Sequence, residues 1–120
     1  LNGHEKPLSG SNILVLGVSY KSDVADLRES PALDVIHVLS SKGAKVVFHD
    51  PYFDHIDVEE FSFDRSDLTA KTLNRTDCVV VTADHSVYDW QWIADNTKLL
   101  IDTRNATAGV GPTICEIHRL

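Results

Sequence analysis

Residues 13–32 read ILVLGVSYKSDVADLRESPA, a short apolar run followed by a long polar stretch that ends at a Ser-Pro pair. The run at residues 13–17 is apolar at every position before its glycine, which is typical of a strand covered on both faces. The polar stretch carries Tyr, Lys, Arg and several carboxylates. This part of the chain therefore predicts a buried strand, a long polar connection and then a helix that begins near Ser30.

The predicted helix has recognisable ends. Ser30 can cap the free N–H groups of the first turn, Pro31 fits the first helical position, and Gly43 can adopt the left-handed conformation that closes a helix. Four apolar side chains recur at three- and four-residue spacing between these ends, namely Ala32, Val35, Ile36 and Leu39. This spacing predicts a helix that buries one face.

The same alternation of short apolar runs and helical patterns continues along the chain. Further strands are predicted at AKVVFHD (44–50), CVVVTA (78–83) and KLLID (98–102). A second helix is predicted at about residues 66–73, and a third contains Trp90, Trp92 and Ile93. Continuously apolar strands that alternate with helices indicate an α/β fold, a three-layer Rossmann-like parallel sheet with helices on both faces.

The composition is that of one globular domain. The chain has 120 residues, of which 42% are hydrophobic and 24% charged, enough for a single buried core. Its formal net charge of −7 argues against nucleic acid as a partner, because such a chain repels a phosphate backbone. No apolar run approaches the roughly 18 residues of a membrane span. We therefore expect neither nucleic acid nor a membrane as partner.

Other features of the composition concern location and chain limits. Cys78 and Cys115 show no CxxC spacing and are expected to be reduced thiols of a cytoplasmic protein. Residues 1–12 (LNGHEKPLSGSN) are polar and contain Gly and Pro, which predicts a linker from a preceding domain, with the folded domain at residues 13–120. The chain contains no Met, which is typical either of a piece of a longer protein or of a chain from which a short leader has been removed. The segment at residues 53–67 and the tail beyond Ala106 carry no clear pattern.

Ligands of an open parallel sheet bind at the carboxyl ends of its strands, so the residues that follow each apolar run are the candidates. They are Tyr20 and Lys21, then Asp50, then residues 82–85, and then Arg104. Gly17 is not followed by the glycines of a dinucleotide fingerprint, and the chain has no Walker sequence. A phosphate group would therefore be held by side chains, and Lys21, Arg28 and Arg104 are the available donors.

Each candidate also has a purely structural interpretation. Lys21 and Arg28 could form surface ion pairs with nearby aspartates in a solvated loop, and Arg104 could pair with Asp102. Asp50 could hold a ribose, although an Asp-Pro sequence is more often a turn. The six histidines show no metal-ligand spacing, and neither cysteine sits where a catalytic thiol is expected. We therefore predict no metal site and no catalytic residue in this chain.

Four blocks, LGVSYKSDVADLRESPALDVI, KGAKVVFHDPY, TADHSVY and LLIDTRNA, resemble the C-terminal, UDP-binding domain of the UDP-glucose/GDP-mannose dehydrogenase family over residues 6–105. The resemblance implies a domain of an enzyme that oxidises the C6 alcohol of a nucleotide sugar to a carboxylate with NAD. The family's NAD fingerprint and catalytic cysteine lie in preceding domains, and nothing here matches them. The chain is thus expected to be inactive alone.

The resemblance also implies roles for individual residues. Tyr20 and Lys21 match the family's aromatic-lysine pair that contacts the UDP part of the substrate, and Arg104 matches an arginine that reaches the nucleotide sugar. Arg28 matches one that approaches NAD. The implied partners are a UDP-sugar, the N-terminal NAD-binding domain and further copies of the full-length enzyme. Two alternatives stay open: a non-catalytic nucleotide-sensing or protein-interaction module, and a self-sufficient NAD domain, which the missing glycines disfavour.

Overall fold

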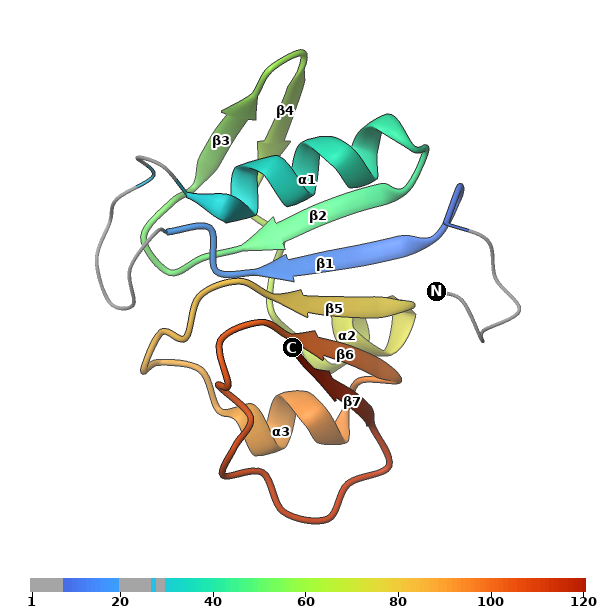
Figure 1. The fold of residues 1–120 in the computed structure, drawn as a ribbon, viewed down its shortest axis with the longest axis vertical. Helices are drawn as coiled ribbons and strands as arrows, with labels where there is room; N and C mark the ends of the chain where they lie inside the picture. Colours follow the sequence, from blue (N-terminus) through green and yellow to red (C-terminus); the bar gives the residue numbers. More distant parts are fainter. Residues whose placement is uncertain (1–7, 20–26, 28–29) are drawn as a thin grey trace.

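The computed structural model describes residues 8–19, 27 and 30–120. Within them, a parallel sheet has the strand order β2-β1-β5-β6-β7 (Figure 1). Its strands are β1 (Asn12–Leu16), β2 (Lys45–His49), β5 (Cys78–Val81), β6 (Leu99–Asp102) and β7 (Glu116–Arg119). Every neighbouring pair is parallel, so the carboxyl ends of these strands lie at one edge of the sheet. The predicted α/β parallel sheet is confirmed.

Helices cover both faces of this sheet. Helix α1 (Pro31–Ser41) packs on one face, while α2 (Ala70–Arg75) and α3 (Trp90–Asp95) pack on the other. Because successive side chains of a strand point to opposite faces, alternate residues of β1 enter different cores. The core beneath α1 includes Ile13, Val15, Ala32 and Ile36. The opposite core includes Leu14, Leu16, Leu73 and Ile93. The predicted three layers are thus confirmed.

The ends of α1 agree with the sequence prediction in all but one respect. The helix begins at Pro31, and Gly43 beyond its end has φ +90°, as the closing glycine should. Ser30 occupies the N-cap position, but its side chain makes no hydrogen bond to the first turn. Its hydroxyl instead donates to the Val18 carbonyl oxygen at 2.5 Å. The capping role predicted for Ser30 is wrong because a carbonyl from the β1 end competes for the same hydroxyl.

The second helix is shorter than predicted, and the third is confirmed. Helix α2 begins only at Ala70, after the N-cap Thr69, instead of at about residue 66. The residues before it stay extended because they pair with the edge of β2: Arg65 bridges to Phe48, and the Ser66 N–H donates to the Phe48 carbonyl at 2.8 Å. Helix α3 contains both tryptophans, as expected.

Three of the described strands lie in the segments that carry no clear sequence pattern. Strands β3 (His55–Val58) and β4 (Phe61–Asp64) form an antiparallel hairpin beside β2. Ile56 and Val58 of this hairpin are buried in the core beneath α1. In the tail, β7 adds an edge strand to β6. None of the described helices has the length and hydrophobicity that a membrane crossing requires.

Candidate functional site

The carboxyl edge of the sheet is held together beyond the last residue of each strand. Backbone hydrogen bonds extend the ladders by one residue: Gly17 N–H to His49 at 2.9 Å, Thr82 N–H to Leu16 at 2.9 Å and Thr103 N–H to Val81 at 3.2 Å. The connections that leave β2, β1, β5 and β6 therefore start side by side. This is the edge at which a ligand of an open parallel sheet binds.

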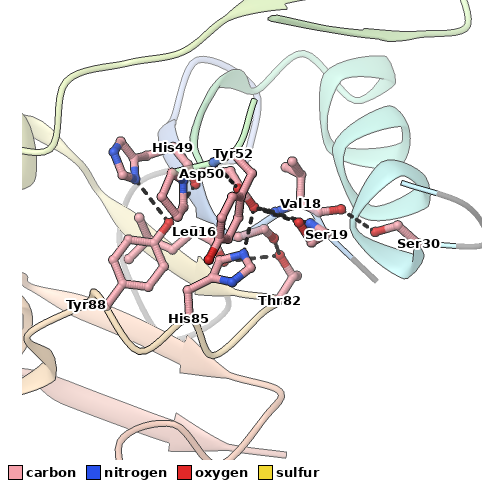
Figure 2. Close-up of polar contacts among 12 residues, drawn as sticks. Leu16, Val18, Ser19, Ser30, His49, Asp50, Tyr52, Thr82, His85 and Tyr88 are labelled. Atoms are coloured by element: carbon pink, nitrogen blue, oxygen red, sulfur yellow. Dashed lines mark hydrogen bonds and ion pairs between the residues drawn. The ribbon is translucent and has the colours of Figure 1, made fainter. Parts of the chain in front are cut away.

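Asp50, the first residue after β2, bonds to residues that follow β1 and β5 (Figure 2). Its side chain has no solvent exposure. The Oδ2 atom accepts hydrogen bonds from the Val18 N–H at 2.8 Å, the Ser19 N–H at 3.3 Å and His85 Nε2 at 2.9 Å. The Oδ1 atom accepts the Tyr52 N–H at 2.9 Å. A buried carboxylate needs such donors, because an uncompensated charge in the interior is costly.

Aromatic side chains separate this carboxylate from water. The His85 ring is fully buried, and its centroid lies 5.1 Å from the ring of Tyr52 and 5.9 Å from the ring of Tyr88. The Tyr88 hydroxyl donates to the His49 carbonyl at 3.0 Å. Burial lowers the pKa of His49 and raises the pKa of Tyr88, so both side chains are held in their neutral forms near pH 7. The donors around Asp50 thus act in a site of low solvent access.

Gly17, the residue after β1, packs closely against Ala83 and does not form a phosphate-binding turn. Its φ is +83°, and a Cβ placed on it would lie 2.5 Å from the Ala83 Cβ. The space that a glycine leaves open in a dinucleotide fingerprint is here filled by Ala83. The Val18 and Ser19 amides that follow are already bonded to Asp50. These two amides are therefore not available to a phosphate.

Both ends of the connection between β1 and α1 meet at one residue. Val18 donates its N–H to Asp50 and accepts the Ser30 hydroxyl at its carbonyl oxygen. The Ser30 N–H donates to the Leu27 carbonyl at 3.2 Å. Val18, Ser19 and Ser30 are all buried. The start and the end of this connection are therefore fixed relative to each other at the carboxyl edge.

A second buried carboxylate organises the loop after β6. Asp102 accepts the backbone N–H groups of Arg104 at 2.9 Å, Ala106 at 3.1 Å and Thr107 at 2.8 Å, and the Thr107 hydroxyl at 2.6 Å. Burial alone would raise the pKa of Asp102, but the bonds from Thr107, Arg104 and Ala106 outweigh it and lower that pKa. Asn105 has φ +58°, a left-handed conformation that this set of bonds holds in place.

Of the predicted ligand residues, Arg104 lies within the described part of the chain. It is exposed on the β6 loop, at the predicted carboxyl edge. Since β5 alone separates β6 from β1, the two strand ends lie about 10 Å apart, two strand spacings. Tyr20, Lys21 and Arg28 lie outside the described residues, so their predicted roles stay predictions. The fold brings the start of the connection between β1 and α1 close to the loop of Arg104.

Asp50, Asp102 and His85 have larger roles in the structure than their sequence patterns predict. The turn at Asp50 is confirmed by the Tyr52 bond, but Asp50 also anchors the β1 connection. Asp102 contacts Arg104 through the backbone N–H of that residue. His85 was placed at the rim of the crevice, whereas it is fully buried against Asp50. The sequence signal for the roles of Asp50 and Asp102 was a carboxylate at the end of an apolar run.

The remaining chemistry of the described residues is structural. Cys78 and Cys115 are buried free thiols, as expected for reduced core cysteines, and burial raises the pKa of each to about 11. Such thiols are poor nucleophiles near neutral pH. Within residues 8–19, 27 and 30–120, no three His, Cys, Asp or Glu side chains gather closely enough to hold a metal ion.

Comparison with known proteins identifies the family of this chain. Residues 14–109 match the profile described as UDP-glucose/GDP-mannose dehydrogenase family, UDP binding domain. The chain belongs to this family. It is 32% identical to a UDP-glucose 6-dehydrogenase of Rickettsia bellii over 111 residues, which cover 84% of this chain and 25% of that protein. It is 35% identical to a UDP-N-acetyl-D-mannosamine dehydrogenase of Methanococcus maripaludis over 111 residues, 86% of this chain and 24% of that protein.

Solved structures show the same fold. A UDP-N-acetyl-mannosamine dehydrogenase from S. aureus superposes with a TM-score of 0.72 at 25% identity, over 92% of this UDP binding domain and 26% of that chain. A UDP-D-ManNAc dehydrogenase from Pyrococcus horikoshii gives a TM-score of 0.68 at 27% identity, over 92% and 25%. The domain thus spans about a quarter of the length of the relatives that it matches.

Proposed function

We propose that this chain is the UDP-sugar-binding domain of an NAD-dependent dehydrogenase that oxidises the C6 alcohol of a UDP-sugar to a uronate. In this proposal Tyr20, Lys21 and Arg104 contact the UDP-sugar, and Arg28 reaches NAD. The family match is the observation that carries the proposal, because the profile of a UDP binding domain covers residues 14–109. The relatives named above are dehydrogenases of UDP-sugars.

The geometry of the carboxyl edge supports side-chain recognition of the diphosphate. The exposed Arg104 and the start of the connection that carries Tyr20 and Lys21 belong to strand ends about 10 Å apart. A guanidinium and an ammonium group can neutralise a diphosphate, and an aromatic ring can stack on a uracil. The domain would then hold the nucleotide while the sugar projects towards the rest of the enzyme.

The described residues do not fit NAD as a resident cofactor. A pyrophosphate cradle needs a glycine-rich turn with free amides, whereas Gly17 packs against Ala83 and the next two amides bond to Asp50. We therefore propose that NAD is bound mainly by an N-terminal domain of the same enzyme, which also supplies the catalytic cysteine. A homo-oligomeric full-length enzyme and a cytoplasmic location complete the proposal, and the buried free thiols favour a reducing compartment.

Titration of the 120-residue chain with UDP tests the binding role. We expect saturable changes in backbone amide NMR signals and in tryptophan fluorescence. Lys21→Ala and Arg104→Ala should each weaken binding about tenfold, the effect of one charge-assisted phosphate contact. Lys42→Ala and Arg75→Ala are matched controls, since both residues are exposed and end helices at the opposite edge of the sheet.

Three outcomes separate the hypotheses. Saturable UDP binding that is weakened only by the first two variants supports the proposal. Equal affinity for all four variants would move the binding site away from these residues. No UDP signal at millimolar concentration would favour the alternative, a protein-interaction module, and the coding sequence upstream would then be expected to lack both a GxGxxG fingerprint and a catalytic cysteine motif.

A further inference from the structure

The buried carboxylate of Asp50 does more than its turn requires. The turn at Pro51 uses Oδ1, which accepts the Tyr52 N–H at 2.9 Å. The Oδ2 atom is left to bond Val18, Ser19 and His85, which lie in other parts of the sheet edge. Burying a carboxylate is costly, and a neutral turn residue would avoid that cost. The partners of Oδ2 therefore indicate a second role.

The partners of Oδ2 define where the β1 connection begins. Val18 and Ser19 are the first two residues after Gly17, and the Ser19 hydroxyl also points to Asp50 at 3.3 Å. The carbonyl oxygen of Val18 accepts the Ser30 hydroxyl from the first residue before α1. Both backbone polar groups of Val18 are thus fixed by side chains distant in the sequence (Figure 2).

We propose that Asp50, supported by His85 and Ser30, is a positioning residue for the UDP-sugar. This inference rests on the proposed function. The bonds to Val18 and Ser19 set the direction in which the chain leaves the sheet immediately before Tyr20 and Lys21. Because Val18 and Ser19 immediately precede Tyr20 and Lys21 in the sequence, a change in their backbone conformation changes where the chain beyond Ser19 begins. A fixed start lowers the conformational entropy lost when the ligand binds.

The surroundings of Asp50 suit this task near an anionic ligand. An exposed carboxylate would repel a diphosphate. Asp50 is fully buried, its oxygens are covered by five donors, and the rings of Tyr52 and Tyr88 flank its partner His85. The carboxylate thereby faces the protein's own donors and is shielded from solvent.

Four substitutions test the inference, each followed by the UDP dissociation constant and by urea unfolding. Asp50→Asn replaces one acceptor oxygen by a donor and should raise the dissociation constant about tenfold or more. Ser30→Ala removes the bond to the Val18 carbonyl oxygen and should raise the dissociation constant about threefold to tenfold. His85→Leu removes the donor to Asp50, whereas His85→Gln keeps an N–H at that position. The leucine variant should bind UDP about tenfold more weakly, and the glutamine variant should recover most of the affinity.

Leu73→Ala is the control for a merely structural effect. Leu73 is fully buried in α2, against the core on the other face of the sheet. Its loss should destabilise the domain at least as much as Asp50→Asn does, while the folded protein keeps the wild-type dissociation constant. Backbone amide signals of Val18 and Ser19 should shift in Asp50→Asn and stay in place in Leu73→Ala.

The outcomes distinguish this inference from the proposed function. If Asp50→Asn and Ser30→Ala bind UDP as the wild type does, the positioning role is refuted and the proposed function stands. If the wild-type chain itself shows no saturable UDP binding, the proposed function fails first and the inference with it. Should Asp50→Asn fail to fold, Ser30→Ala and the two His85 variants decide, because they leave the Asp50 side chain in place.

Discussion

Gly17→Ala should be among the most destabilising methyl additions in this domain. Gly17 ends β1 with φ +83°, where an L-residue is strained. The added Cβ would lie 2.5 Å from the Ala83 Cβ, 2.8 Å from its carbonyl oxygen and 2.9 Å from its Cα. Two of these three atoms are backbone, at the end of the neighbouring strand β5. The collision cannot be relieved by rotating a side chain.

The magnitude follows from two terms. The left-handed conformation costs a residue with a Cβ about 1–2 kcal/mol relative to glycine. Forcing a methyl group into a packed interior costs about 1–3 kcal/mol more. The free energy of unfolding should therefore fall by about 2–5 kcal/mol, a large part of the about 5–15 kcal/mol that holds a typical domain folded.

Urea unfolding followed by circular dichroism measures this loss, and Gly10→Ala is the matched control. Gly10 has almost the same φ, +84°, but a Cβ placed there meets nothing within 4 Å. Gly10→Ala should therefore lower the free energy of unfolding only by the conformational cost, about 1–2 kcal/mol. Ala83→Gly, introduced with Gly17→Ala, removes the closest contact and should recover part of the loss. Equal destabilisation by Gly10→Ala and Gly17→Ala would refute the packing argument.

Two further predictions concern titrating groups. The pKa of Asp102 is lowered in the folded state, so its ionised form stabilises the fold at a pH above the usual pKa of 3.8, and this stabilisation is lost as the pH falls below that value. Asp102→Asn should lower the free energy of unfolding by about 1.5–3 kcal/mol at neutral pH. It should also weaken the dependence of that free energy on pH in the acid range. Hydrogen bonds to Asp64 and Asp57 raise the pKa of His55, while burial lowers that of His49. NMR titration should place their midpoints on opposite sides of about 6.5, and coinciding midpoints would contradict the described contacts.

Local patterns predicted most of the fold. Continuous apolar runs such as those at residues 13–17 and 78–81 identify strands buried on both faces, and the stripe of α1 identifies the helix between them. The hairpin and β7 were missed because their four-residue strands are short and partly exposed. Their place depends on pairing with β2 and β6, which a local pattern does not encode.

The sequence predicted which edge of the sheet holds the site, but not the hydrogen bonds within the site. Parallel topology alone places the residues after each strand together, and this located Asp50 and Arg104 correctly at the carboxyl edge. The partners of the Asp50 Oδ2 atom lie 31 to 35 residues away along the chain. Those contacts depend on strand register and on the turn of Gly17, and both arise only when the sheet has formed. Ser30 shows the same limit. The local pattern predicted that its hydroxyl caps the helix, but the hydroxyl donates to the carbonyl oxygen of Val18, 12 residues away.

The use of Asp50 as an internal anion leads to a last prediction, on NAD. In a dinucleotide-binding domain, the amides after the first strand bind a pyrophosphate. Here the amides of Val18 and Ser19 bind a carboxylate of the protein itself, and α1 starts only at Pro31. The 120-residue chain should therefore bind UDP without showing saturable affinity for NADH. Energy transfer from Trp90 and Trp92 to the nicotinamide measures this directly. Saturable NADH binding at micromolar concentration would refute the argument that Asp50 occupies the amides that a dinucleotide needs.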